Sequence, residues 1–70
     1  MLFTDVSSKR AINALEKNGF WVSKTSGKHI GMTNGARKIT IPRHGRINPY
    51  TLKSIIRDGG LTDEEFKKLL

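Results

Sequence analysis

The residues best suited to chemistry in this chain are a histidine and the lysines around it. His29 follows a glycine turn, with Lys28 directly before it and Lys24 five residues earlier. Histidine is the side chain whose charge changes near neutral pH, so it can take up and release protons there. Lysines beside such a group indicate that its substrate carries phosphate. The pattern is therefore typical of a nuclease.

A second basic segment lies at residues 42–47. His44 in this segment suits a structural role in a turn as well as a phosphate contact, and the lysines and arginines are also open to interpretation as solvated surface charge. We interpret six side chains as candidate phosphate contacts of a nucleic acid: Lys24, Lys28, Lys38, Arg43, His44 and Arg46.

The balance of charge supports a nucleic-acid partner. The 70 residues carry a formal net charge of +7, and the sequence pI is about 10.3. Residues 1–57 hold 11 of the 13 lysines and arginines but only two acidic residues, Asp5 and Glu16. A basic body with a mildly acidic tail is the electrostatic footprint of nucleic-acid binding. The alternative is a lysine-rich surface that only maintains solubility.

Composition excludes several other classes of site. Because the chain has no cysteine, disulfides and thiolate zinc sites are excluded, and a reducing cytoplasm is the simplest location. Two histidines are too few for a zinc site, and only Asp5 and Glu16 are carboxylates outside the tail, so we expect no metal and no cofactor. No apolar run spans a membrane and no signal peptide is evident, so residues 1–70 are expected to form one domain away from membranes.

The elements that must position His29 are three short strands. Aromatic and β-branched residues predict strands at 20–24, 28–32 and 37–41, joined by turns at Ser26-Gly27 and Asn34-Gly35. Alternation along these strands places apolar side chains on one face and His29 on the other. The expected inward residues are Phe20, Val22, Ile30, Met32, Ile39 and Ile41, and the expected outward residues are Trp21, Ser23, His29, Gly31, Lys38 and Thr40.

Helices are predicted before and after these strands in the sequence. Residues 8–18 have apolar positions at helical spacing, a serine cap at Ser7 or Ser8, and Gly19 as the end signal. A second helix begins at Asn48-Pro49, a cap followed by proline at the first helical position. The expected buried stripes are Ala11, Ile12, Ala14 and Leu15 in the first helix and Leu52, Ile55 and Ile56 in the second.

The C-terminal segment predicts one more short helix. Gly59-Gly60 ends the preceding helix, Thr62 and Glu65 form a capping box, and Leu61 is placed to staple onto Phe66. The predicted fold class is therefore α+β, in the order α-β-β-β-α with a short C-terminal helix. Because a sheet buries its apolar face against another layer, we expect the helices to pack on one face of a three-stranded antiparallel sheet and to leave the face of His29 exposed.

Over nearly its whole length the chain resembles the HicA family of toxins. The resemblance rests on residues 7–20, Ser26-Gly27-Lys28-His29, Ile41-Pro42-Arg43-His44 and residues 49–66. It implies a double-stranded-RNA-binding-domain-like fold, which agrees with the predicted order of elements. It also implies a toxin that cleaves messenger RNA, a HicB-type antitoxin that neutralises it, and His29 as the catalytic histidine. Lys28 stands where the family often has a small hydroxyl residue.

A single histidine is chemically sufficient for such cleavage because RNA carries its own nucleophile, the 2′-hydroxyl. We expect His29 to take the proton of that hydroxyl. Lys24, Lys28 and Lys38 are placed to stabilise the charge that develops on the phosphate. This endoribonuclease route needs no metal, leaves a 2′,3′-cyclic phosphate and spares DNA.

Two other functions fit the same residues. One is a non-catalytic RNA-binding module of the same fold, with basic residues that contact an A-form duplex. The other is an interaction protein whose basic face docks an acidic partner. The antitoxin implied by the resemblance is expected to cover the face of His29, and DNA would be contacted only through that antitoxin. Trp21 suits a stacked base, a cover over part of the sheet, or a protein contact.

Overall fold

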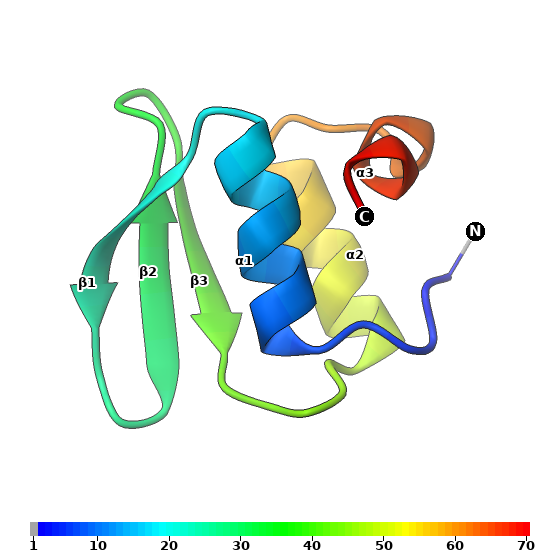
Figure 1. Cartoon of the computed structure of the whole chain (residues 1–70), viewed down its shortest axis with the longest axis horizontal. Coiled ribbons are helices and arrows are strands. Elements are labelled where there is room, and N and C mark those ends of the chain that lie inside the picture. The colour runs from blue at the N-terminus through cyan, green and yellow to red at the C-terminus, as the bar shows by residue number, and fades with distance from the viewer. Residues whose placement is uncertain (1) are drawn as a thin grey trace.

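The chain folds into a sheet layer and a helix layer, and the computed structural model describes residues 2–70 (Figure 1). The sheet has the strand order β1-β2-β3, with both neighbouring pairs antiparallel. The predicted order α-β-β-β-α with a short last helix is confirmed. The elements are α1 (Ser8–Lys17), β1 (Trp21–Thr25), β2 (His29–Thr33), β3 (Lys38–Pro42), α2 (Pro49–Asp58) and α3 (Asp63–Leu69).

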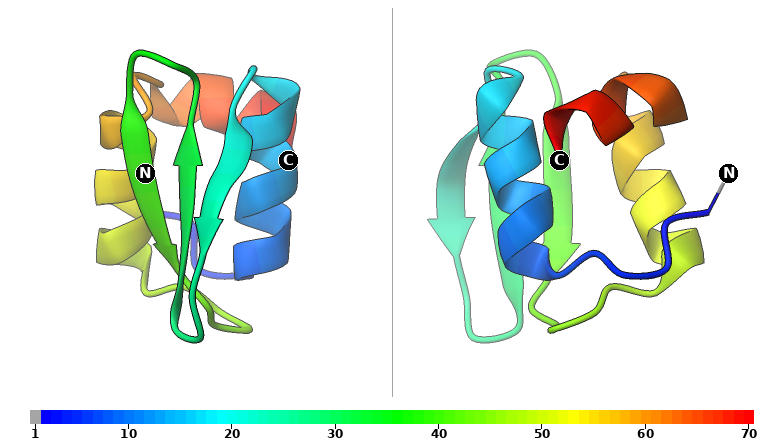
Figure 2. Two further views of the ribbon diagram at one scale, coloured as in Figure 1. Left: turned by 90° about the vertical axis from the view of Figure 1, so that its left-hand side faces the viewer. Right: turned by 45° about the vertical axis from the view of Figure 1, so that its right-hand side comes forward.

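All three helices lie on the same side of the sheet (Figure 2). The face turned away from them is called the open face below. Along β2 the side chains alternate as predicted, because Met32 is buried while His29 is exposed. Each strand begins one residue later than expected, a shift within the ordinary uncertainty of element ends.

The core forms where α1 and α2 bury their apolar stripes against β2 and β3. Met32 pairs with Ile39, and Ile30 pairs with Ile41, so these four side chains point to the helices together. The predicted stripes of both helices are confirmed, with Ile12 of α1 partly rather than fully buried. Ile30 of β2 is also partly buried. The buried residues are Val6, Ala11, Ala14, Leu15, Phe20, Met32, Ile39, Ile41, Ile47, Leu52, Ile55, Ile56 and Phe66.

One residue that was expected to point inward, Val22, is not buried. Val22 pairs with Met32 and so faces the helix side, yet its side chain is 42% exposed. The cause is the reach of the helix layer, which packs on β3 and leaves the strand farthest from it, β1, uncovered (Figure 1).

Local side-chain hydrogen bonds fix where the helices begin. The Ser7 hydroxyl accepts from the backbone N–H of Arg10 at 3.2 Å. The Asn48 side chain accepts from the N–H of Tyr50 at 2.9 Å, and Pro49 follows at the first helical position. Both caps satisfy N–H groups that have no partner inside the helix, as the sequence predicts.

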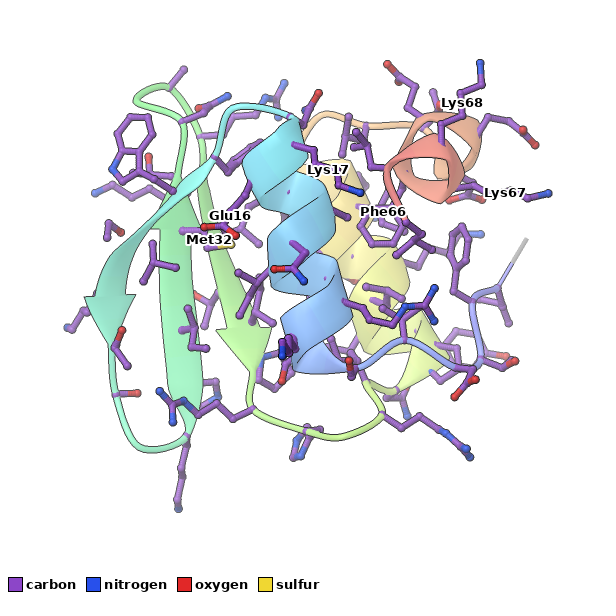
Figure 3. All side chains as sticks on the ribbon, in the orientation of Figure 1. Glu16, Lys17, Met32, Phe66, Lys67 and Lys68 are labelled. Atoms are coloured by element: carbon purple, nitrogen blue, oxygen red, sulfur yellow. The ribbon has the colours of Figure 1, made fainter. Side chains whose placement is uncertain are left out.

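The last helix, α3, is held against the other two by one large aromatic side chain. Phe66 is fully buried, and its ring meets that of Phe3 edge-on, with centroids 5.4 Å apart. Phe66 points inward from α3, whereas Lys67 and Lys68 point away (Figure 3). Lys17 of α1 donates to the carbonyl of Leu69 at 3.1 Å, and the capping box predicted at Thr62 is present.

Truncation of Phe66 tests how much of the stability comes from α3. We expect Phe66→Ala to lower the free energy of unfolding by about 3–5 kcal/mol, because it removes a buried ring and leaves a cavity. Urea unfolding followed by circular dichroism measures the loss. Lys68→Ala, on the exposed side of the same helix, is the control and should stay within about 0.5 kcal/mol of the wild type. Equal stability of Phe66→Ala and Lys68→Ala would show that α3 is not part of the cooperative core.

Candidate functional site

The hairpin between β1 and β2 fixes the backbone of His29. The Ser26 hydroxyl accepts from the N–H of His29 at 3.1 Å and donates to its carbonyl at 3.0 Å. The Ser26 N–H also donates to the same carbonyl at 2.9 Å. Serine in a turn commonly bonds nearby backbone in this manner. Ser26 is therefore a positioning residue for the histidine.

The side chain of His29 lies on the open face, as alternation predicts. It is exposed, and within residues 2–70 the imidazole has no hydrogen-bond partner. The imidazole is therefore open to a ligand on this face. This placement satisfies the geometric requirement for a proton-transfer group, which must reach a bound substrate.

A β-bulge in β1 brings Lys24 to the same face. The register places Val22 opposite Met32 and Lys24 opposite Gly31, so Ser23 is an extra residue between the two pairs. Strict alternation after Val22 would have turned Lys24 toward the helix side. The extra residue reverses its direction, which is the effect expected of a bulge.

Around His29 the open face is hollowed into a shallow depression of about 290 Å³, called the His29 depression below. Its floor includes Gly31, where a Cβ would lie 3.4 Å from the Cβ of Lys24 and 3.8 Å from the hydroxyl of Ser23. The absence of a side chain at Gly31 keeps the space between the histidine and the lysine open. The lining residues are Lys24, Ser26, His29, Gly31 and Thr40.

Part of the basic loop after β3 lies at the same end of the sheet as His29. His29 pairs with Pro42, and the N–H of Arg43 donates to the carbonyl of Lys28 at 3.0 Å, so these two basic residues are neighbours. The loop is also tied to the start of α1, because the carbonyl of His44 accepts from the N–H of Ser8 at 3.0 Å.

Two other predicted phosphate contacts, Arg46 and Lys38, do not line the His29 depression. The Arg46 guanidinium lies 3.7 Å from the Asp5 carboxylate, in an exposed pair that contributes little to stability. Lys38 pairs with Thr33, four residues along β2 from His29, which corresponds to about 13 Å at the rise of a strand. The structure therefore groups Lys24 with His29 and places Lys38 at the opposite end of the open face.

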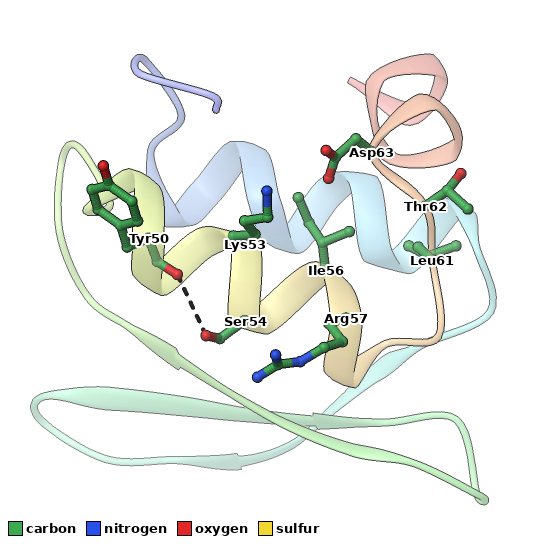
Figure 4. A pocket seen from close by; sticks show the side chains of 8 residues that line it. All are labelled: Tyr50, Lys53, Ser54, Ile56, Arg57, Leu61, Thr62 and Asp63. Carbon is green, nitrogen blue, oxygen red and sulfur yellow. Dashed lines mark hydrogen bonds between the residues drawn. The ribbon is translucent and has the colours of Figure 1, made fainter. Parts of the chain in front are cut away.

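A larger hollow of about 530 Å³ lies on the outer side of α2 and the segment that leads to α3 (Figure 4). Tyr50, Lys53 and Arg57 contribute polar groups to it, and Ile56 and Leu61 contribute apolar surface. It is separated from the open face by the helix layer. Because it holds no histidine or other group suited to proton transfer near neutral pH, size alone does not make it the chemical site.

Three residues of the His29 depression were not among the predicted site residues. Gly31 and Thr40 pair across the strands and share the face of His29, so alternation already indicated their position. Ser26 was expected only as a turn residue, in agreement with the tendency of serine hydroxyls in turns to bond backbone groups nearby in the chain.

The described residues contain neither a metal-binding cluster nor a membrane-spanning helix. In the part of the chain that the structure describes, no three His, Asp or Glu side chains come together as a metal-binding group. None of the helices in residues 2–70 has the length and apolar character needed to cross a bilayer.

Comparison with protein families gives a match that covers most of the chain. The chain fits the family described as the HicA toxin of bacterial toxin-antitoxin over residues 8–61. The match includes α1, all three strands and α2, and therefore every residue of the His29 depression. No curated protein matches the chain.

Proposed function

This chain belongs to the HicA family of toxins of bacterial toxin–antitoxin systems, and from this premise we propose that it is an endoribonuclease that cleaves messenger RNA with His29 as its catalytic residue. One observation carries the proposal. An accessible imidazole and a lysine lie together in a depression on a sheet face that no helix covers. An extended RNA strand can approach such a face without any rearrangement of the core.

In the proposed reaction the RNA supplies the nucleophile. His29 takes the proton of a 2′-hydroxyl, and the resulting oxygen attacks the adjacent phosphorus. The bond from phosphorus to the 5′ oxygen breaks, and that oxygen takes a proton from water or from the imidazolium of His29. The products are a 2′,3′-cyclic phosphate and a 5′-hydroxyl. The Lys24 ammonium stabilises the negative charge on the phosphate oxygens, because it lies in the same depression.

Loss of the imidazole should slow cleavage strongly without loss of binding. We expect His29→Ala to cleave RNA roughly 100- to 10,000-fold more slowly, the usual contribution of general acid–base catalysis. Cleavage of a labelled single-stranded RNA in the presence of EDTA measures the rate, and mass spectrometry identifies the cyclic phosphate. Affinity should be retained, since the lysines and arginines remain.

Two controls accompany this experiment. His44→Ala removes the histidine of the basic loop, a candidate phosphate contact and not the proposed proton-transfer group, and should therefore retain kcat. A substrate with 2′-deoxyribose at the cleaved position should be resistant. Equal rates for the wild type and His29→Ala would remove His29 from the mechanism. RNA binding without fragments from either protein would instead indicate a non-catalytic RNA-binding module.

Substitutions of the two open-face lysines, Lys24 and Lys38, are expected to change different kinetic parameters. Lys24→Gln should lower kcat by roughly 10- to 100-fold, because its charge lies where the phosphate reacts. Lys38→Gln should mainly raise KM, because it lies about 13 Å away along the strand. Steady-state kinetics at fixed low salt separate the two parameters. A loss of kcat in Lys38→Gln alone would contradict the assignment of Lys24 as the catalytic cation.

The partner that we propose is a HicB-type antitoxin that covers the His29 depression. Two features support this assignment: the depression is shallow and exposed, and the lysines and arginines at this end of the sheet complement an acidic partner. Inhibition would then be steric, because RNA and antitoxin need the same surface.

Chemical accessibility of the histidine tests this mode of inhibition. We expect diethylpyrocarbonate to modify His29 in the free toxin and much less in the purified complex, as measured by mass spectrometry of the peptides. His44, which is exposed in the free protein, provides an internal comparison. An inhibited complex in which His29 reacts as fast as in the free toxin would exclude steric coverage.

A further inference from the structure

We propose that a single-stranded RNA crosses the open face from the His29 depression to Trp21, where one of its bases stacks on the indole ring. The inference rests on the proposed function, since it extends the same substrate along the same face. It assigns Trp21 as a binding residue for a base several nucleotide positions from the cleaved bond.

The strand register defines the path. His29 forms the first row on the open face with Pro42. The second row contains Lys24, Gly31 and Thr40, and the third contains Trp21, Thr33 and Lys38. The first and third rows are four residues apart along β2, or about 13 Å, so a base on Trp21 belongs to a different nucleotide from the one at His29.

The indole is exposed and lies beside the turn that joins β2 and β3. Trp21 is 51% exposed, and its Cη2 atom lies 3.7 Å from the position that a Cβ on Gly35 would occupy. Gly35 belongs to the β2–β3 turn and has a φ of +93°. The ring therefore lies beside a glycine turn, and the positive φ of Gly35 is a conformation that other residues rarely adopt.

Hydrogen bonds make that turn rigid. The Asn34 side chain accepts from the N–H groups of Ala36 and Arg37, at 2.9 and 2.7 Å. The Thr33 hydroxyl donates to the carbonyl of Arg37 at 2.7 Å. The surface beside the ring is therefore already ordered, so stacking a base on Trp21 requires little ordering of this turn.

The surroundings of the ring favour a nucleobase over an apolar protein partner. Trp21 is the only tryptophan of the chain, and its neighbours in the third row are the polar Thr33 and the cationic Lys38. An apolar partner would need a contiguous apolar patch. One aromatic ring in the same row as a cation, on a basic face, matches the combination that binds single strands through stacking and phosphate contacts.

The ring also provides the measurement, because its fluorescence reports on its own environment. The His29→Ala variant is titrated with a short single-stranded RNA and, separately, with an abasic strand of the same length and charge. We expect the RNA to quench the emission of Trp21 strongly and the abasic strand to bind with little quenching. Equal quenching by both strands would overturn the proposal.

Affinity measurements on Trp21 variants provide the second arm. In the His29→Ala background, Trp21→Thr should weaken RNA binding roughly 5- to 150-fold, the range for loss of one stacked base, while Trp21→Phe should retain most of the affinity. Threonine suits an edge strand, and circular dichroism verifies the fold. Tyr50→Thr, which removes another exposed aromatic side chain from α2, is the control and should change nothing.

The outcomes separate this inference from the proposed function. Stacking on Trp21 by a wild type that cleaves no RNA would refute the nuclease and leave the binding path intact. Cleavage by the wild type with no effect of Trp21→Thr would refute the path alone. Quenching by purified antitoxin but not by RNA would assign the ring to a protein contact and overturn the proposal.

Discussion

Burial of apolar side chains on a single face of the sheet is the constraint on which the rest of this structure depends. A domain of 70 residues buries only about 60% of the surface of its unfolded chain, so it can afford one core. That core uses the helix side of β2 and β3, with Met32, Ile39 and Ile41 fully buried. Because side chains alternate along a strand, burial of Ile30 and Met32 also sets the direction of His29. The position of His29 is therefore a consequence of hydrophobic packing on the opposite face.

Much of this arrangement can be predicted from the sequence because the deciding interactions are local. The helix limits follow from caps such as Ser7, Asn48 and Thr62, whose side chains bond backbone groups two or three residues away. The open-face position of His29 follows from the period of a strand together with its two apolar neighbours. Ser26-Gly27 is recognisable as a turn, although its role in fixing the backbone of His29 emerges only from the folded hairpin.

Other features depend on pairing and packing that local patterns do not contain. The extra residue at Ser23 is defined only by comparison of β1 with β2, and this comparison determines which way Lys24 points. The exposure of Val22 depends on how far the helix layer reaches across the sheet. The separation of Lys38 from His29 depends on the direction and register of β3, so a list of basic residues could not distinguish a neighbour from a remote one.

The position of β1 outside the helix layer has a consequence for local opening. β1 is held mainly by its pairing with β2, all five of its side chains are exposed, and no helix packs substantially on it. Elements with few buried contacts open at a lower free energy than the whole domain. Detachment of β1 would remove Lys24 from the neighbourhood of His29 while the core under α1 and α2 stayed intact. The fraction of molecules with a complete site is thus set by a local equilibrium of one hairpin, and changes in that equilibrium need not appear in the melting temperature of the domain.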